Sequence, residues 1–360
     1  MAHALGLAAR GLGATWPNPA VGCVIVQGSR IVGRGWTQPG GRPHAEAVAL
    51  AQAGDAARGA TAYVTLEPCA HLSERGPDCS GSLIAAGLAR VVTALQDPDP
   101  RTAGRGHARL RAAGIAVETG CMAEEAADDL GGFLSRVLSG KVSVTLKLAS
   151  TLDGRIATAS GESKWITGPL ARRDVHALRA RHDAVLVGVG TALADDPALT
   201  VRDLGVTRQP VRVVMDSRLR LPVTSRLGQS AGQVPVWLLH GTQAPDAACA
   251  AWQAVGARLI ELPSDGKGSL DAFGALQALA GAGLTRVLCE GGAGVAGALL
   301  ATGRVDRLVI YQAGRVFGAD GLAAVAPFGV RDLPSGPAPW RLIDVVALGE
   351  DIRARWARRG

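Results

Sequence analysis

The sequence predicts two α/β domains in one chain, and three observations support this. The chain has 360 residues, whereas a domain averages about 150. Apolar residues make up 48% and charged residues 19%, so the chain can bury cores and is not disordered. Short apolar runs that resemble strands alternate with segments that resemble helices, which is typical of helices packed on a sheet. No run approaches the roughly 18 apolar residues of a membrane span.

The first 120 residues alternate between the two kinds of element, starting with a helix. Residues 28–29 (Gly-Ser) separate two apolar runs and predict a hairpin. The expected helices are 3–12, 44–53, 80–88 and 105–113, and the expected strands are 20–27, 30–36, 61–66, 90–95 and 115–118. We expect a mostly parallel, buried sheet covered by helices. A further helix over 123–138 ends at Ser139-Gly140, where we place the domain boundary.

The second part of the chain repeats this alternation. It opens with a strand over 142–148 and a turn at Asp153-Gly154. Further strands are expected at 183–189, 211–215, 235–240, 286–289 and 306–312, with helices at 169–181, 270–280 and 293–302. Residues 228–268 are rich in Gly, Ala and Pro and give little pattern beyond that strand.

The net charge of +7 is unevenly placed. Residues 1–140 contain 12 basic and 12 acidic side chains, so the whole excess lies in the remainder. Arg353, Arg355, Arg358 and Arg359 crowd the C-terminus and are expected to form a solvated tail. The rest is mildly basic, which suits a phosphorylated small molecule as much as a nucleic acid.

The cellular compartment can be inferred from the six cysteines and from the first residues of the sequence. Residues 1–13 include His3 and Arg10 and lack the apolar core of a secretory signal. They predict an amphipathic helix. Without such a signal, we expect reduced thiols and a cytoplasmic protein.

Three short motifs in the first domain together indicate a zinc site. His44 and Glu46 begin an expected helix, Cys69 follows Glu67-Pro68 after a strand, and Cys79 follows after nine intervening residues. One His and two thiolates leave the fourth tetrahedral position of Zn²⁺ open for water, as a catalytic site requires. The metal lowers the pKa of that water to about 7. Glu46 is then the non-ligand carboxylate that moves protons, as in zinc deaminases.

Each motif alone has a simpler interpretation. A histidine at a helix start is usually a cap or a surface residue, and a cysteine after proline usually packs in the core. Their order and their places on the expected elements make the zinc site specific. We expect His71 to line the same pocket, whereas the other histidines and cysteines have no comparable neighbours in the sequence.

The second domain contains polar and glycine-rich segments that point to a nucleotide. Residues 289–297 follow a strand and open a helix with bare backbone amides, which suit a diphosphate. The spacing is not that of a Rossmann fingerprint, so this signal is weak by itself. Lys147, Asp195 and Glu290 are further polar residues of these segments. The Asp195-Asp196-Pro197 run could equally end a turn.

The first domain closely resembles the bifunctional riboflavin-biosynthesis deaminase/reductases. The matching stretches are PNPAVGCVIV at 17–26, PGGRPHAEAVAL at 39–50, YVTLEPCAH at 63–71 and QDPDP…GRG at 96–106. The resemblance implies a cytidine-deaminase-like fold and a hydrogen bond from Asn18 to the substrate. The spacing from Cys69 to Cys79 is one residue longer than the family pattern, with the extra residue in the loop 73–76.

The second domain is similar to the reductase domain of the same family. The matching stretches are KLASTLDGR, GESKWIT, GTALADDPALTVR, VVMDSRLRLP and EGGAGVAGALL, in that order. The resemblance implies a dihydrofolate-reductase-like α/β fold and NADPH. It implies cofactor contacts from Ala149, Trp165, Thr191, Asp195, Ser217, Gly292, Ala293, Gly294, Val295, Ala296, Gly297 and Ala298. It implies substrate contacts from Ser163, Arg179, Leu199, Arg202 and Glu290, and the two arginines would suit a phosphate as bidentate donors.

The resemblance therefore implies two successive reactions. Residues 1–140 would form a zinc-dependent pyrimidine deaminase domain acting on 2,5-diamino-6-ribosylamino-4(3H)-pyrimidinone 5′-phosphate. Residues 141–360 would form an NADPH-dependent reductase domain that converts the ribosyl group to ribityl. The product would be 5-amino-6-ribitylamino-uracil 5′-phosphate. Lys147 is a candidate for proton handling in the second step, and a homodimer or tetramer is expected.

Three alternatives remain open at this point. The chain could deaminate while its second domain is inactive. It could edit nucleic acid, although the dispersed arginines and 4% aromatic residues lack the basic stripe and stacking platform of such proteins. It could be a non-enzymatic zinc scaffold, although structural zinc sites normally have four protein ligands.

Overall fold

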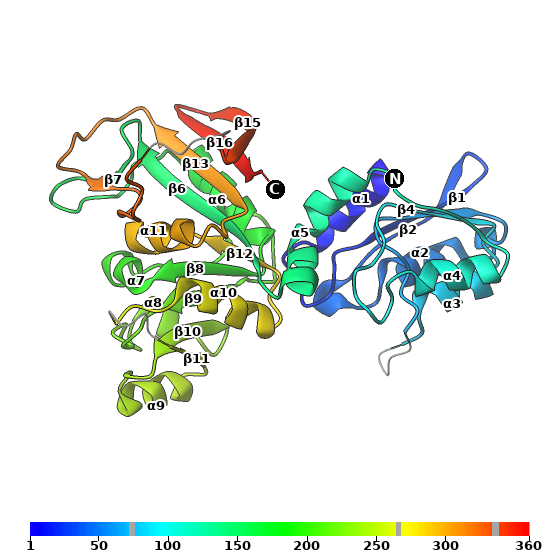
Figure 1. Cartoon of the computed structure of the whole chain (residues 1–360), viewed down its shortest axis with the longest axis horizontal. Helices are drawn as coiled ribbons and strands as arrows, with labels where there is room; N and C mark the ends of the chain where they lie inside the picture. Colours follow the sequence, from blue (N-terminus) through cyan, green and yellow to red (C-terminus); the bar gives the residue numbers. More distant parts are fainter. Residues whose placement is uncertain (72–75, 264–267, 333–337, 360) are drawn as a thin grey trace. The chain divides into compact units, whose positions relative to one another are not determined.

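The structure is a computed structural model that describes residues 1–71, 76–263, 268–332 and 338–359. The chain divides into two compact units, Met1–Lys141 and Val142–Gly360 (Figure 1). Most of the loop expected to hold the extra residue between the two cysteines, residues 73–75, lies outside the described residues. No helix in the described ranges is both long enough and apolar enough to cross a membrane.

The first unit contains a five-stranded sheet in the order β2-β1-β3-β4-β5. The strands are β1 (Gly22–Gln27), β2 (Arg30–Trp36), β3 (Thr61–Val64), β4 (Arg90–Thr93) and β5 (Ala116–Glu118). The hairpin expected at Gly28 is confirmed. The expectation of a mostly parallel sheet is wrong, because β1 pairs antiparallel with both β2 and β3. A two-residue turn can only return the chain antiparallel.

The α-helices of the first unit are α1 (Ala2–Ala8), α2 (Ala45–Ala53), α3 (Cys79–Ala85), α4 (Arg105–Ala112) and α5 (Ala123–Ser139). Two of them start at candidate zinc ligands, since His44 precedes α2 and Cys79 begins α3. Two glycines of β2 let α2 lie directly on the sheet. A Cβ at Gly35 would stand 2.1 Å from the carbonyl oxygen of Ala45, and one at Gly33 would stand 2.2 Å from that of Ala49. Only glycine permits this approach, which fixes the start of α2 next to His44.

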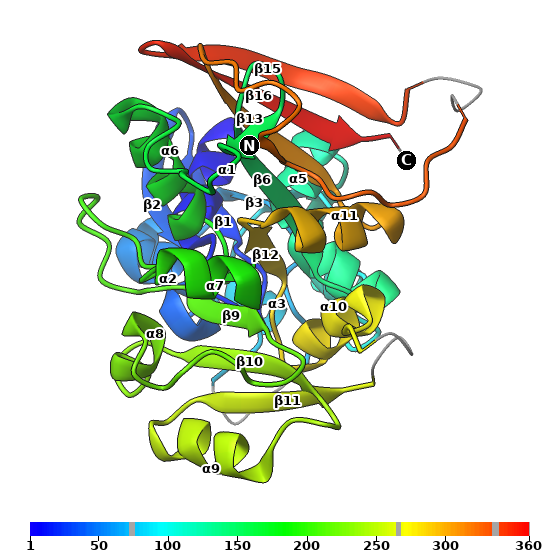
Figure 2. The same cartoon turned by 90° about the vertical axis from the view of Figure 1, so that its left-hand side faces the viewer.

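The second unit contains a nine-stranded sheet in the order β11-β10-β9-β8-β12-β6-β13-β16-β15. Its strands are β6 (Ser143–Thr151), β8 (Ala184–Gly188), β9 (Val211–Met215), β10 (Val236–Gly241), β11 (Arg258–Leu262), β12 (Arg286–Cys289), β13 (Arg307–Ala313), β15 (Trp340–Leu348) and β16 (Asp351–Arg358). A small separate pair joins β7 (Arg155–Ala157) to β14 (Leu322–Ala323). Pairing is parallel from β11 to β13, and only β16 and β15 pair antiparallel. Figure 2 shows β11 and the C-terminal hairpin at opposite edges of this sheet.

The helices of the second unit follow most of the expected segments. They are α6 (Pro169–Ala180), α7 (Val189–Asp195), α8 (Arg226–Gln229), α9 (Asp246–Ala254), α10 (Ala272–Gly281) and α11 (Ala293–Ala301). The segment that gave little pattern contains α9 and β11 as well as the expected strand. Trp252 of α9 is fully buried and donates a hydrogen bond to the carbonyl oxygen of Leu221 at 3.1 Å. Most residues around Trp252 are alanines, so the sequence shows no alternation of apolar and polar residues with the period of a helix.

The arginine-rich C-terminus is a strand and not the solvated tail that the sequence suggested. Residues of β16 pair with β13 on one side and with β15 on the other. Arg353 forms an ion pair with Asp174, and Arg355 pairs with Asp344. These arginines alternate along the strand, so they lie on one face, where acids from other elements neutralise them.

A buried histidine of the second unit makes its stability depend on pH. The Nδ1 atom of His182 lies 2.7 Å from the carbonyl oxygen of Leu178, and Nε2 lies 2.9 Å from the hydroxyl of Thr145. A carbonyl only accepts, so Nδ1 carries the proton and Nε2 accepts from the hydroxyl. Burial lowers the pKa of His182 to about 3, so the neutral ring is the folded form.

The unfolding free energy of this unit should therefore fall as the pH drops below 6.5. In the unfolded chain this histidine has a pKa of about 6.5 and becomes protonated as the pH falls, whereas in the folded chain it stays neutral. Between pH 6.5 and pH 5 this difference lowers the unfolding free energy by about 1.5 kcal/mol. Urea unfolding followed by tryptophan fluorescence would measure this loss. His182→Gln should remove that part of the pH dependence, and an unchanged slope in the variant would contradict the assignment.

Candidate active sites

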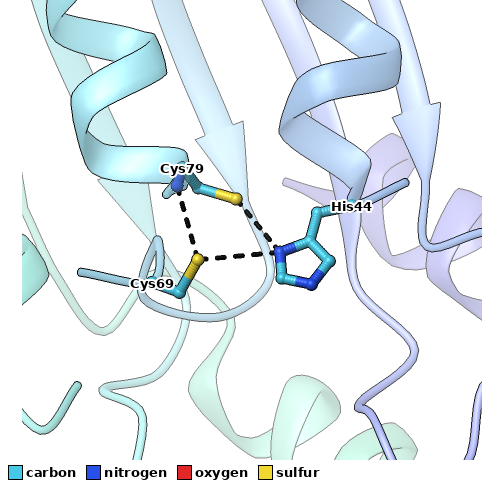
Figure 3. Close-up of side chains that lie close together, drawn as sticks. All are labelled: His44, Cys69 and Cys79. Carbon is cyan, nitrogen blue, oxygen red and sulfur yellow. Dashed lines mark hydrogen bonds between the residues drawn. The ribbon is translucent and has the colours of Figure 1, made fainter. Parts of the chain in front are cut away.

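Three side chains of the first unit converge on one point. The ligand atoms of His44, Cys69 and Cys79 all lie within 4.8 Å of one another. The Nδ1 atom of His44 is 3.2 Å from the sulfur of Cys79 and 3.6 Å from the sulfur of Cys69 (Figure 3). His44 precedes α2, Cys69 follows β3, and Cys79 is the first residue of α3. One nitrogen and two sulfurs in a partly buried triangle fit Zn²⁺ with one coordination position left over.

The surroundings of Cys69 favour the thiolate, which is the form that binds metals. The backbone amide of Cys79 donates a hydrogen bond to the sulfur of Cys69 at 3.3 Å. The hydrogen bond from the thiol of Cys79, helped by His44, lowers the pKa of Cys69 to about 4 despite burial. Asp78 caps α3 by accepting from the amide of Gly81 at 2.6 Å, so the helix that supplies Cys79 has a fixed start.

Glu46 lies in the first turn of α2, two residues after His44. Its side chain is buried, with 3% of the residue exposed. Burial raises the pKa of Glu46 above its usual range, although the charge of His44 opposes this. A carboxyl group with a raised pKa both takes and returns a proton readily at neutral pH.

Glu67 has a role that the sequence did not reveal. Its carboxylate accepts hydrogen bonds from the backbone amides of Asp97 at 3.2 Å, Gly104 at 2.9 Å and His107 at 3.0 Å. These amides lie 30 to 40 positions away, so no local spacing pointed to them. The carboxylate thus connects the loop over residues 97–104 and the first turn of α4 to the segment that carries Cys69.

The other two candidates of this unit also contact loops. The amide nitrogen of Asn18 donates to the carbonyl oxygen of Gly41 at 3.0 Å, which connects the loop between the two prolines to the segment before His44. The Nδ1 atom of His71 lies 3.3 Å from the hydroxyl of Thr102 in the loop held by Glu67.

The second unit has a cavity of about 680 Å³. It is lined by ten of the residues that the sequence singled out: Lys147, Ala149, Ser163, Trp165, Arg179, Thr191, Asp195, Leu199, Arg202 and Glu290. The volume and the apolar and charged lining are typical of a site for small ligands. Sequence reasoning missed further basic residues there, Lys164, Arg172, Arg173, His176 and Arg226. The helical spacing of Arg172 and His176 from Arg179 could have found two of these missed basic groups.

Ser217 and the segment Gly292–Ala298 are not among the residues that line this cavity. The segment does open α11 as expected. The amide of Gly292 donates to the hydroxyl of Thr191, a lining residue, at 2.8 Å. The start of α11 therefore lies beside the cavity wall.

A buried ion pair occupies one side of the cavity. The guanidinium of Arg179 meets the carboxylate of Glu290 in a bidentate pair, with distances of 2.5 Å and 2.9 Å. Its remaining nitrogen donates to the carbonyl oxygen of Thr200 at 2.9 Å. The sequence analysis expected the guanidinium of Arg179 to bind a phosphate, but in this structure it binds Glu290. Burial would raise the pKa of Glu290, but Arg179 holds it below its usual value.

Lys147 lies on β6, beside the strand that leads to Glu290. Burial lowers the pKa of its ammonium group, while the negative charge of Glu290 opposes this. Leu146 and Cys289 are partners in the parallel pairing of β6 with β12, so Lys147, in the middle of β6, lies beside the end of β12 that Glu290 follows. A lysine with a lowered pKa gives up its proton more readily than an exposed one and can serve as an acid in catalysis.

Comparison with known proteins gives matches to both units. Residues 1–95 match the cytidine and deoxycytidylate deaminase zinc-binding region, and residues 142–354 match the RibD C-terminal domain. The chain is similar to riboflavin biosynthesis protein RibD of Escherichia coli, with 44% identity over 98% of this chain and 96% of the relative. The corresponding protein of Haemophilus influenzae is 40% identical over 100% of this chain and 97% of the relative.

Two solved structures match over the whole chain. Acinetobacter baumannii RibD, form 1, has a TM-score of 0.88 at 40% identity and covers 100% of this chain and 98% of its own. A Thermotoga maritima diaminohydroxyphosphoribosylaminopyrimidine deaminase/5-amino-6-(5-phosphoribosylamino)uracil reductase has a TM-score of 0.85 at 33% identity, covering 100% and 97%. These likenesses confirm the predicted fold class of a cytidine-deaminase-like unit followed by a reductase unit.

Proposed function

Because the chain belongs to the RibD family of riboflavin-biosynthesis enzymes, we propose that its two units divide the two reactions of that family. The protein is a bifunctional deaminase and reductase that uses zinc and NADPH. Residues 1–140 are the deaminase domain, and residues 141–360 are the reductase domain. The observation that carries this division is the triangle of His44, Cys69 and Cys79 beside Glu46 in one unit and the basic cavity in the other.

The substrate of the first reaction is 2,5-diamino-6-ribosylamino-4(3H)-pyrimidinone 5′-phosphate. His44, Cys69 and Cys79 would hold the zinc ion, which would supply an activated water at neutral pH. Glu46 accepts a proton from that water and delivers one to the departing amine, which leaves as ammonia. Asn18 orients the pyrimidine by a hydrogen bond, while Glu67 holds the loop that carries Thr102.

The second reaction reduces the ribosyl group, giving 5-amino-6-ribitylamino-uracil 5′-phosphate. As the ribose ring opens, the exocyclic nitrogen forms a double bond to the sugar carbon, the bond from that carbon to the ring oxygen breaks, and Lys147 gives the oxygen a proton. Bound NADPH would supply the hydride that reduces this carbon. Glu290 and Arg179 form the polar wall beside Lys147. Arg202, exposed at the cavity, is the donor that suits the substrate phosphate.

The remaining ligand contacts are assigned to the cavity and its edge. Ser163, Arg179, Leu199, Arg202 and Glu290 contact the substrate. The cofactor contacts come from Ala149, Trp165, Thr191, Asp195, Ser217 and the turn Gly292–Ala298. Three features support them: nine of the assigned residues line one cavity, Gly292 is hydrogen-bonded to Thr191, and helix starts attract diphosphates.

We also assign the protein to the cytoplasm and to a homodimer or tetramer formed through the second unit. The edge strand β15 supports the second assignment, because it exposes Leu342 at 44% and Val345 at 55%. Exposed apolar side chains on an unpaired strand edge favour association. The described cysteines are all free thiols, which is compatible with a reducing compartment.

Removing zinc should abolish ammonia release and leave reduction intact. A chelator-treated protein given the diamino substrate is expected to release no ammonia, while it still oxidises NADPH when given the deaminated intermediate. Added Zn²⁺ should restore deamination. Cys79→Ser should lower the bound zinc, whereas Cys121→Ser, a half-buried thiol outside the triangle, should not. Ammonia release by the metal-free protein would refute the zinc mechanism.

A further inference from the structure

The C-terminal strand β16 contacts α6 at the start of that helix. The amide of Gly168, the residue that caps α6, donates a hydrogen bond of 2.6 Å to the carboxylate of Asp351. Asp351 is buried, with 5% of the residue exposed. The capping residue itself, Gly168, has no side chain that could accept a hydrogen bond from the first amides of the helix. A carboxylate at this position satisfies an otherwise orphaned amide and is favoured by the helix dipole.

A second contact joins β16 to the middle of the same helix. One guanidinium nitrogen of Arg353 lies 3.0 Å from each carboxylate oxygen of Asp174. The hydroxyl of Tyr311, a fully buried residue of β13, donates to the same carboxylate at 2.6 Å. Ala171 and Val175 of α6 pack around Tyr311. Asp174 is thus the point at which two strands and one helix are connected, near the hairpin seen at the edge of the sheet in Figure 2.

Another face of α6 lines the reductase cavity. Arg172, His176 and Arg179 stand four and seven positions apart, so they lie on one side of the helix, and all three line the cavity. Arg172 lies over the ring of Trp165 at 4.7 Å from its centroid. Arg179 holds Glu290. The position of α6 therefore decides where these cationic groups stand.

We propose that Asp351 and Arg353 are positioning residues of the reductase site, acting through α6. Together they hold the helix at its start and at its middle, so that its cationic face remains directed at the bound ligands. Neither residue lines the cavity. The proposal rests on the reductase function proposed above for the second unit. A displacement of about 1 Å in such a face can cost up to about a hundredfold in rate.

The test compares two arginines of the same strand in the full chain. Arg353→Met removes the contact to Asp174, whereas Arg358→Met is the matched control, because Arg358 lies over Trp340 within the hairpin. We expect Arg353→Met to raise the KM for the phosphorylated pyrimidine by about tenfold, since α6 is no longer fixed. The control should keep the wild-type KM. A protein that is merely destabilised loses active enzyme, which lowers the apparent kcat at unchanged KM, so the KM separates the two roles.

Further variants check that the effect passes through Asp174. Asp174→Asn should raise the KM as Arg353→Met does, and the double variant should be no worse than either single one. Arg353→Lys should recover most of the lost affinity. If Arg353→Met does not fold, Asp351→Asn provides the same KM measurement, with an expected rise of about threefold.

The KM measurements and the NADPH oxidation of the wild-type protein test the positioning role and the reductase function separately. A wild-type KM in Arg353→Met and Asp351→Asn, or an equal rise in Arg358→Met, would overturn the positioning role. Failure of the wild-type protein to oxidise NADPH with the deaminated intermediate would instead overturn the proposed reductase function. Ammonia release measured on the same samples reports that the first unit is folded.

Discussion

Glu46→Gln is expected to lower ammonia release by about 10²- to 10⁴-fold, the usual contribution of a positioned acid-base group. Glutamine has nearly the same shape but cannot take a proton from the attacking water. The zinc ligands His44, Cys69 and Cys79 are unchanged, so the bound zinc should stay at the wild-type level. Ammonia release with the diamino substrate and metal analysis of the purified variant would measure both effects.

The second unit provides an internal control for this variant. When the deaminated intermediate is supplied, NADPH oxidation should proceed at the wild-type rate. Glu118→Gln is a matched control in the first unit, because Glu118 is an exposed acid paired with Arg90 and should leave deamination unchanged. Loss of zinc from Glu46→Gln would show that the carboxylate is a ligand, and near-normal ammonia release would exclude it as the proton carrier.

Lys147→Met is expected to lower NADPH oxidation by about 10²- to 10⁴-fold while ammonia release stays normal. Methionine keeps the apolar stem of the buried side chain and removes the proton that opens the ribose ring. Single-turnover oxidation of NADPH with the deaminated intermediate would measure the loss. Unchanged oxidation would exclude Lys147 as the acid.

The pH profile tests the same assignment by a separate route. Burial lowers the pKa of Lys147, and the lysine must be protonated to act as an acid. Wild-type NADPH oxidation should therefore decline, as the pH rises, at a lower pH than an exposed lysine would give. The residual activity of Lys147→Met should lack this decline. A decline that persists in the variant would belong to another group.

The zinc site could be predicted because its ligands and Glu46 lie in short sequence motifs. His44 and Glu46 are two residues apart, Cys79 begins α3, and Cys69 lies in the segment that connects β3 to α3. The structure brings the three ligand side chains within 4.8 Å. What the sequence could not show is how the site is held. Glu67 binds amides from residues 97, 104 and 107, and such contacts depend on the tertiary fold rather than on spacing.

The C-terminus shows the opposite limit. Four arginines within seven residues resemble a solvated tail because their partners are distant in the sequence. Asp174, the partner of Arg353, lies 179 positions away. Residues 351–358 form a strand that pairs with β13 and β15. The alternation of Ile352, Ala354 and Trp356 with charged residues is a strand signal, which the crowding of arginines concealed. Likewise, α9 in the alanine-rich segment is defined by the burial of Trp252.

The two units of one chain are expected to carry out their reactions in a fixed order. The most direct measurement follows ammonia and NADPH together after the diamino substrate is added to the purified protein. Ammonia should appear first, and NADPH should then be consumed in equal amount. A mixture of Glu46→Gln and Lys147→Met proteins should recover both reactions, because each supplies the unit that the other lacks. Ammonia release without consumption of NADPH would contradict the account.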